Sequence, residues 1–106
     1  MISTHILDTH LGQPARNVAV KLYDASGTLL AEAETNQDGR VSDFQLSQIN
    51  SGDYSLEFST ADYFKRLNLA TFFPKAVIHF SIVDVRQHYH IPLLISPFAY
   101  STYRGS

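Results

Sequence analysis

The sequence predicts an all-β protein, an antiparallel β-sandwich of about eight strands with one short helix. Apolar and polar residues alternate along several short stretches, and clusters of turn-forming residues separate those stretches. Alternation with a period of two is typical of strands that bury one face, and many short strands at regular spacing are typical of sandwiches. With 106 residues, the chain has the length of one domain, and we expect a single domain over residues 1–106.

Seven stretches have the pattern of strands. The clearest is GDYSLEFS, in which Tyr54, Leu56 and Phe58 alternate with polar residues. Turn signals such as DASG, NQDG and NSGD lie between the stretches. The expected strands are ISTHILD (2–8), NVAVKLYD (17–24), TLLAEAET (28–35), GDYSLEFS (52–59), VIHFSIVD (77–84), HYHIPLLIS (88–96) and FAYSTYR (98–104).

Two features depart from plain alternation. In STADYFKRLN, Ser59 or Thr60 can cap a helix, and the large apolar residues Tyr63, Phe64 and Leu67 follow at helical spacing. We therefore expect a helix of two to three turns there. Pro92 interrupts an otherwise regular strand; because proline cannot donate to a ladder, this strand is expected at a sheet edge or at a bulge.

Composition excludes several classes of function. The chain has no cysteine, which excludes disulfides, thiolate nucleophiles and cysteine-bound zinc. The net charge is −2 without a basic run, so nucleic acid is not an expected partner. No apolar stretch approaches the length of a membrane span, so a membrane is not an expected partner either. The first residues have no secretory pattern, and the expected location is the cytoplasm.

A few polar residues have the chemistry of an acid–base site. His88 and His90 are two apart, so on a strand they share a face. His5 lies inside the first expected strand, and Arg40 follows the NQDG turn. Imidazole exchanges protons near neutral pH, and a guanidinium holds planar polar groups and stabilises negative charge. With a phenol such as Tyr103, these groups suffice for a metal-free site.

Other interpretations of the same residues stay open at this point. His88 and His90 can ligate zinc, but a stable site needs a third ligand and none is adjacent. His88 alone fits structural hydrogen bonding better than chemistry. His10 and His79 fit exposed surface positions, and Tyr100 and Tyr103 can be aromatic residues at the edge of the sandwich.

Three blocks of sequence resemble one family. STHILDTHLGQPARNVAVKLYD at 3–24, TNQDGRV at 35–41 and HYHIPLLISPFAYSTYRGS at 88–106 are similar to the 5-hydroxyisourate hydrolases, the transthyretin-related proteins of purine catabolism. The final Tyr-Arg-Gly-Ser is the most specific of these elements, because it separates the hydrolases from the hormone-carrying transthyretins. Phe98 and Ala99 depart from the usual tyrosine and glycine of the hydrolases, which affects pocket detail rather than activity.

The resemblance implies a fold, an assembly and a site. The fold is a transthyretin-like β-sandwich, and four subunits form a dimer of dimers whose active sites lie where two dimers meet. The resemblance implies catalytic roles for His5, His90 and Arg40, and substrate binding by His5, Arg40, Tyr103 and Ser106, with no metal ligands. One histidine would act as general base on water while the other orients the water or protonates the leaving nitrogen. Ser106 and its carboxylate would help to orient a histidine or the water.

The implied reaction is the hydrolytic opening of the six-membered ring of 5-hydroxyisourate, giving 2-oxo-4-hydroxy-4-carboxy-5-ureidoimidazoline. This is acyl transfer to water and requires no cofactor. Two other functions remain alternatives. One is a transthyretin-like carrier of small aromatic ligands in the central channel, which calls for a less polar lining. The other is an immunoglobulin-like interaction module, in which the histidines have no catalytic role.

Overall fold

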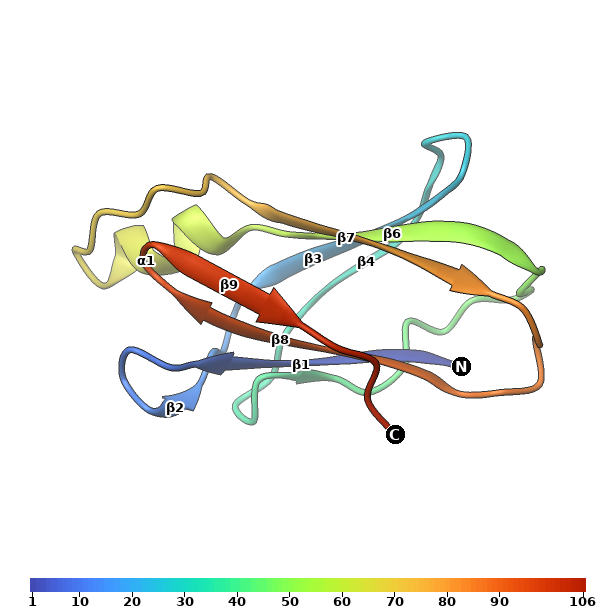
Figure 1. The fold of residues 1–106 in the computed structure, drawn as a ribbon, viewed down its shortest axis with the longest axis horizontal. Coiled ribbons are helices and arrows are strands. Elements are labelled where there is room, and N and C mark those ends of the chain that lie inside the picture. The colour runs from blue at the N-terminus through green and yellow to red at the C-terminus, as the bar shows by residue number, and fades with distance from the viewer.

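The computed structural model describes residues 1–106 as two β-sheets packed face to face, with a single helix at one end (Figure 1). Strands β3 and β6 lie in the centre of one sheet, whose order is β4-β3-β6-β7. The other sheet has the order β2-β1-β8-β9, and β5 also pairs with β1. The elements are β1 (Ile2–Asp8), β2 (Gln13–Pro14), β3 (Ala19–Asp24), β4 (Leu29–Glu34), β5 (Arg40–Val41), β6 (Gly52–Phe58), α1 (Thr60–Arg66), β7 (Ala76–Ile82), β8 (Tyr89–Ser96) and β9 (Ala99–Thr102).

The predicted sandwich is confirmed, and one strand pair adds a detail that alternation does not show. All pairs are antiparallel except β1 and β8, which run parallel, with Ser3 opposite His90 in the register. The chain completes the β4-β3-β6-β7 sheet before β8 returns beside β1. This parallel pair brings the first and last blocks of the sequence into direct contact.

The core lies between the sheets and confirms the predicted strand faces. Tyr54, Leu56 and Phe58 are all buried, as are the inward residues of β3. The helix buries Tyr63 and Phe64 against this core, whereas Leu67 ends the helix and is 39% exposed. The expected helix is therefore present, but its apolar face is shorter than the spacing indicates.

Neither position expected for Pro92 is found: β8 lies between β1 and β9 rather than at an edge, and its pairing with these strands shows no register shift of the kind a bulge produces. Pairing of β8 with β9 stops at Leu93, and the chain meets β8 again only at the bridge between His90 and Gly105. Pro92 lies in the gap between these two contacts. The ladder is interrupted there, so a residue without an N–H can occupy a central strand.

Two very short strands, β2 and β5, extend the sheet beyond β1. Neither has enough residues to show alternation.

No helix of the chain is both long enough and apolar enough to cross a membrane.

Candidate active site

His90 is the centre of the candidate site. It lies near the start of β8, half-buried, and its Nδ1 atom is 2.7 Å from the hydroxyl oxygen of Ser3 on the neighbouring strand β1. The same Ser3 hydroxyl is 2.7 Å from Nε2 of His88. Because one ring nitrogen of His90 is committed to Ser3, its Nε2 atom is the one left to meet a substrate or a water molecule.

The C-terminal tail packs on His90. The backbone N–H of Gly105 donates to the carbonyl of His90 at 2.9 Å. A Cβ atom on Gly105 would lie 2.5 Å from Cδ2 of the His90 ring, so only glycine lets the tail approach this closely. Arg104 also holds the tail: its guanidinium lies over the Tyr89 ring, 4.9 Å from the ring centroid, and donates to the side-chain oxygen of Gln87 at 2.9 Å.

The NQDG turn places Arg40 beside β1. The side-chain oxygen of Asn36 accepts from the backbone N–H groups of Asp38 and Arg40, which closes the turn. Gly39 has a φ of 73°, and a Cβ there would lie 2.5 Å from the carbonyl oxygen of Ile6. The turn therefore needs glycine at this position, and it sets Arg40 directly opposite His5 in the β1–β5 pair.

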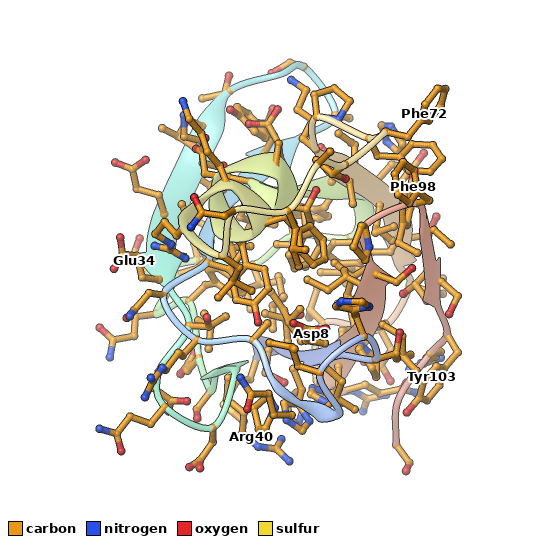
Figure 2. The ribbon with its side chains drawn as sticks, turned by 90° about the vertical axis from the view of Figure 1, so that its left-hand side faces the viewer. Asp8, Glu34, Arg40, Phe72, Phe98 and Tyr103 are labelled. Carbon is orange, nitrogen blue, oxygen red and sulfur yellow. The ribbon has the colours of Figure 1, made fainter.

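Two hollows meet at His90. The first is polar, has a volume of about 330 Å³, and is lined by Arg40, Ser106, His88 and His90 among others. The second has a volume of about 300 Å³, and Tyr103 and Phe80 line it together with His90. Each is as large as the smallest pockets that bind small molecules. Figure 2 shows Arg40 and Tyr103 toward the same lower side of the molecule.

Burial and a nearby positive charge lower the pKa of both site histidines. Burial lowers the pKa of His90 below its ordinary value of 6.5, the positive charge of Arg40 and then the neighbouring imidazoles lower it further, and a hydrogen bond with the backbone of Ser3 partly opposes this shift. Burial also lowers the pKa of His5, Arg40 adds to this effect, and Asp38 partly opposes it. A neutral imidazole can accept a proton, so at neutral pH both rings have the protonation state of a general base.

The expected site residues fall into two groups. Arg40, His90 and Ser106 line one hollow, whereas His5 lines neither hollow and lies opposite Arg40 in the β1–β5 pair. Tyr103 lies at the other hollow, and it is 60% exposed in the isolated chain. His10 and His79 are exposed, as expected. No group of three or more histidine, cysteine or carboxylate side chains is arranged to hold a metal ion.

Sequence reasoning missed two contributors, Ser3 and Gly105. Ser3 is a buried polar residue in a strand, 4% exposed, and nothing in the alternation of β1 distinguishes it. Its role becomes visible only through the parallel register that sets it opposite His90. Gly105 belongs to the tail block, but its contact with the His90 ring depends on the fold.

Comparison with known proteins identifies the family of this chain. A family model described as HIUase/Transthyretin family matches residues 2–105. The chain is 43% identical to a 5-hydroxyisourate hydrolase of Salmonella dublin over 110 residues, covering 100% of this chain and 81% of that protein. It is also 43% identical to a 5-hydroxyisourate hydrolase of Halalkalibacterium halodurans, covering 99% of this chain and 97% of that protein.

Solved structures show the same likeness in three dimensions. The 5-hydroxyisourate hydrolase of Klebsiella pneumoniae superposes with a TM-score of 0.91 at 41% identity, covering 99% of this chain and 98% of that one. A transthyretin from Sparus aurata also gives a TM-score of 0.91, at 31% identity and with 98% and 95% coverage. A sequence match and a fold match that both span nearly the whole chain lead to one conclusion: the chain belongs to the HIUase/Transthyretin family.

Proposed function

We propose that this protein hydrolyses 5-hydroxyisourate to 2-oxo-4-hydroxy-4-carboxy-5-ureidoimidazoline, a step in urate breakdown. The observation that carries the proposal is that His90, Arg40 and the C-terminal Ser106 line one cleft, with His5 paired opposite Arg40 in the β1–β5 pair. The hydrolase names of the relatives from Salmonella dublin and Klebsiella pneumoniae support the choice of substrate.

The chemistry follows from the groups at the cleft. Nε2 of His90 removes a proton from water as the water oxygen attacks a ring carbonyl carbon. Arg40 donates to the carbonyl oxygen as it becomes an oxyanion, which stabilises the transition state. The ring C–N bond then breaks, and the leaving nitrogen takes the proton that the added water oxygen still carries, which leaves a carboxylate; neutral His5 orients the water. One water is consumed, and the products are a carboxylate and a urea group.

Tyr103 and Ser106 have binding roles in this proposal. Tyr103 is exposed and lines the second hollow, which shares His90 with the hollow that Arg40 lines, so its phenol can donate to an oxygen of a planar substrate bound at His90. Ser106 lines the same hollow as Arg40 and can orient the attacking water. Binding at both ends of the ring holds it against His90, and such positioning lowers the barrier in the same way as an intramolecular reaction.

The test is the ultraviolet decay of freshly prepared 5-hydroxyisourate with and without the protein. The wild-type protein should accelerate the decay, and His90→Asn should reduce turnover by about 10²–10⁴-fold, the usual contribution of general acid–base catalysis. His10→Gln is the matched control, because His10 is an exposed histidine outside the cleft. Decay at the uncatalysed rate with the wild-type protein would refute the proposal.

A carrier of small aromatic ligands is the second candidate, supported by the likeness to the transthyretin of Sparus aurata. Arg40 and the imidazoles favour hydrolysis, because a carrier of apolar rings gains little from such polar groups. A carrier would bind an aromatic probe stoichiometrically and leave the decay rate unchanged, so the same experiment separates the two functions.

We further propose that the working form is a homotetramer, a dimer of dimers. The strongly exposed Tyr103 and the open shape of both hollows support an assembly in which a second subunit closes the cleft. Light scattering coupled to gel filtration should give four times the chain mass of 11.9 kDa. A monomer with full activity would contradict this part of the proposal.

A further inference from the structure

Ser3 connects the two histidines of the HYH motif. Its hydroxyl oxygen is 2.7 Å from Nδ1 of His90 and 2.7 Å from Nε2 of His88. Ser3 is buried, His90 is half-buried and His88 is exposed. The three side chains therefore form a continuous hydrogen-bonded path from the floor of the cleft to solvent.

The hydroxyl couples the protonation of the two rings. A serine hydroxyl has one proton, so it donates to one ring nitrogen and accepts from the other. In one arrangement Ser3 accepts from Nδ1–H of His90 and donates to Nε2 of His88, which leaves Nε2 of His90 as a free base. In the other arrangement both hydrogen bonds reverse, and His90 carries its proton on Nε2. Changing the tautomer of one ring therefore changes the other.

We propose that Ser3 and His88 are positioning residues that form a proton relay between Nδ1 of His90 and solvent. The proposal rests on the proposed hydrolysis, in which His90 takes a proton from water at Nε2. The Nδ1 proton then passes to the Ser3 oxygen, and the hydroxyl proton of Ser3 passes to Nε2 of His88. His90 ends neutral with its proton on Nε2, and His88 ends as an imidazolium in contact with water.

The charges around His90 favour this transfer. Arg40 approaches from β5 and His5 from β1, while His88 precedes β8 itself. The chain ends at Met1 and Ser106 also line this hollow. A second positive charge on His90 is costly next to Arg40 and partly removed from water, whereas an exposed imidazolium keeps its hydration. The relay moves the charge to the ring that water can reach.

His88→Gln separates a relay from simple positioning. Glutamine can keep a hydrogen bond to Ser3 but cannot accept a proton as a base. The relay predicts that kcat falls about tenfold, a fraction of a full acid–base contribution, while KM stays unchanged. It also predicts that higher concentrations of imidazole buffer restore part of kcat. Because His88 is exposed, this variant should fold normally, and His10→Gln is the matched control.

Ser3→Ala removes the hydroxyl at the centre of the path and should lower kcat as much as His88→Gln does. Ser3→Thr keeps a hydroxyl at this position and should have a kcat close to that of the wild-type protein. Thr9→Val is the control, because that hydroxyl donates to the carbonyl of Ile95 just beyond the other end of β1. If the kcat of His88→Gln equals that of the wild-type protein and does not depend on the imidazole concentration, the relay is overturned.

A measurement without substrate keeps the relay distinct from the proposed function. Two-bond ¹H–¹⁵N spectra report which nitrogen of each ring is protonated. In the wild-type protein the tautomers of His88 and His90 should change together with pH, and in Ser3→Ala they should titrate independently. Independent titration in the wild type would overturn the relay. Coupled titration in a protein that does not accelerate the decay would instead support the relay contact and refute the substrate.

Discussion

Arg40 is the residue that sets the charge of the candidate site. It lies opposite His5 in the β1–β5 pair and lines the hollow that contains His90. After burial, its positive charge is the next largest cause that lowers the pKa of both histidines. In the proposed reaction this one side chain would therefore serve two purposes: it would stabilise the oxyanion, and it adds to the effect of burial in lowering the pKa of the nearby imidazoles.

Replacing Arg40 by glutamine should change the pH dependence as well as the rate. Both histidine pKa values rise when the positive charge is removed, so a higher pH is needed to keep the base neutral. The acidic limb of kcat/KM, which reports the free enzyme, should move to higher pH in Arg40→Gln. In the wild-type protein that limb should lie below the ordinary histidine value of 6.5.

The measurement is a series of initial decay rates of 5-hydroxyisourate between pH 5 and 8. Arg16→Gln is the control, because Arg16 is an exposed arginine outside both hollows at His90. A lower rate at every pH with an unmoved acidic limb would show that Arg40 acts on the substrate alone.

At the scale of elements, the C-terminal tail belongs to the candidate site because backbone and side-chain contacts hold it against β8. The bridge between Gly105 and His90, together with the stacking of Arg104 over Tyr89, fixes a segment that would otherwise be loose. The tail then lies against the ring that we propose as the base, and its position determines the room around that ring.

Gly105→Ala should therefore impair catalysis more than stability. The backbone of Gly105 is not in the left-handed region, but the added methyl group meets Cδ2 of His90 at 2.5 Å, so either the ring or the tail must move. We expect kcat to fall by at least about tenfold, because small displacements of catalytic groups are costly. Urea unfolding should change little, since the tail adds almost nothing to the core.

Gly27→Ala is the contrasting variant. Gly27 has a φ of 85° and open space around it, so alanine there costs about 1 kcal/mol of stability through backbone strain and leaves kcat unchanged. Equal kcat values in wild type and Gly105→Ala would show that the close approach of the tail to His90 has no catalytic role.

The sequence predicts an element only where its residues form a local pattern, such as the alternation of apolar and polar side chains in a strand. Strands such as β6 bury one face, so alternation in GDYSLEFS identifies them directly. The two-residue strand β5 has no such signal, yet it sets Arg40 opposite His5. The link from Ser3 to His90 depends on a parallel register between residues 87 positions apart, and local patterns contain no information on that register. The resemblance to the family named His5, His90 and Arg40, but not the hydroxyl between His88 and His90.

At the scale of the whole molecule, a buried hydrogen bond joins the helix to the sheet that contains β1. Tyr63 lies in α1, which directly follows β6 of one sheet, and its hydroxyl donates to Oδ2 of Asp8 at 2.7 Å. Asp8 ends β1 of the other sheet, and its Oδ1 accepts the backbone N–H groups of His10 and Leu11. Burial raises the pKa of the Tyr63 phenol and the Asp8 carboxylate raises it further, so the phenol stays a hydrogen-bond donor throughout the physiological range.

Tyr63→Phe should lower the free energy of unfolding by about 1–3 kcal/mol, because a carboxylate oxygen of Asp8, itself only 1% exposed, loses its partner. The urea midpoint should fall while the slope stays the same, since the surface exposed on unfolding does not change. Tyr23→Phe is the control: Tyr23 is a half-buried tyrosine on β3 in the sheet away from the site. Activity per folded molecule should stay unchanged in both variants, because Asp8 lies at the opposite end of β1 from Ser3. An unchanged midpoint in Tyr63→Phe would mean that apolar packing alone holds the helix to the sandwich.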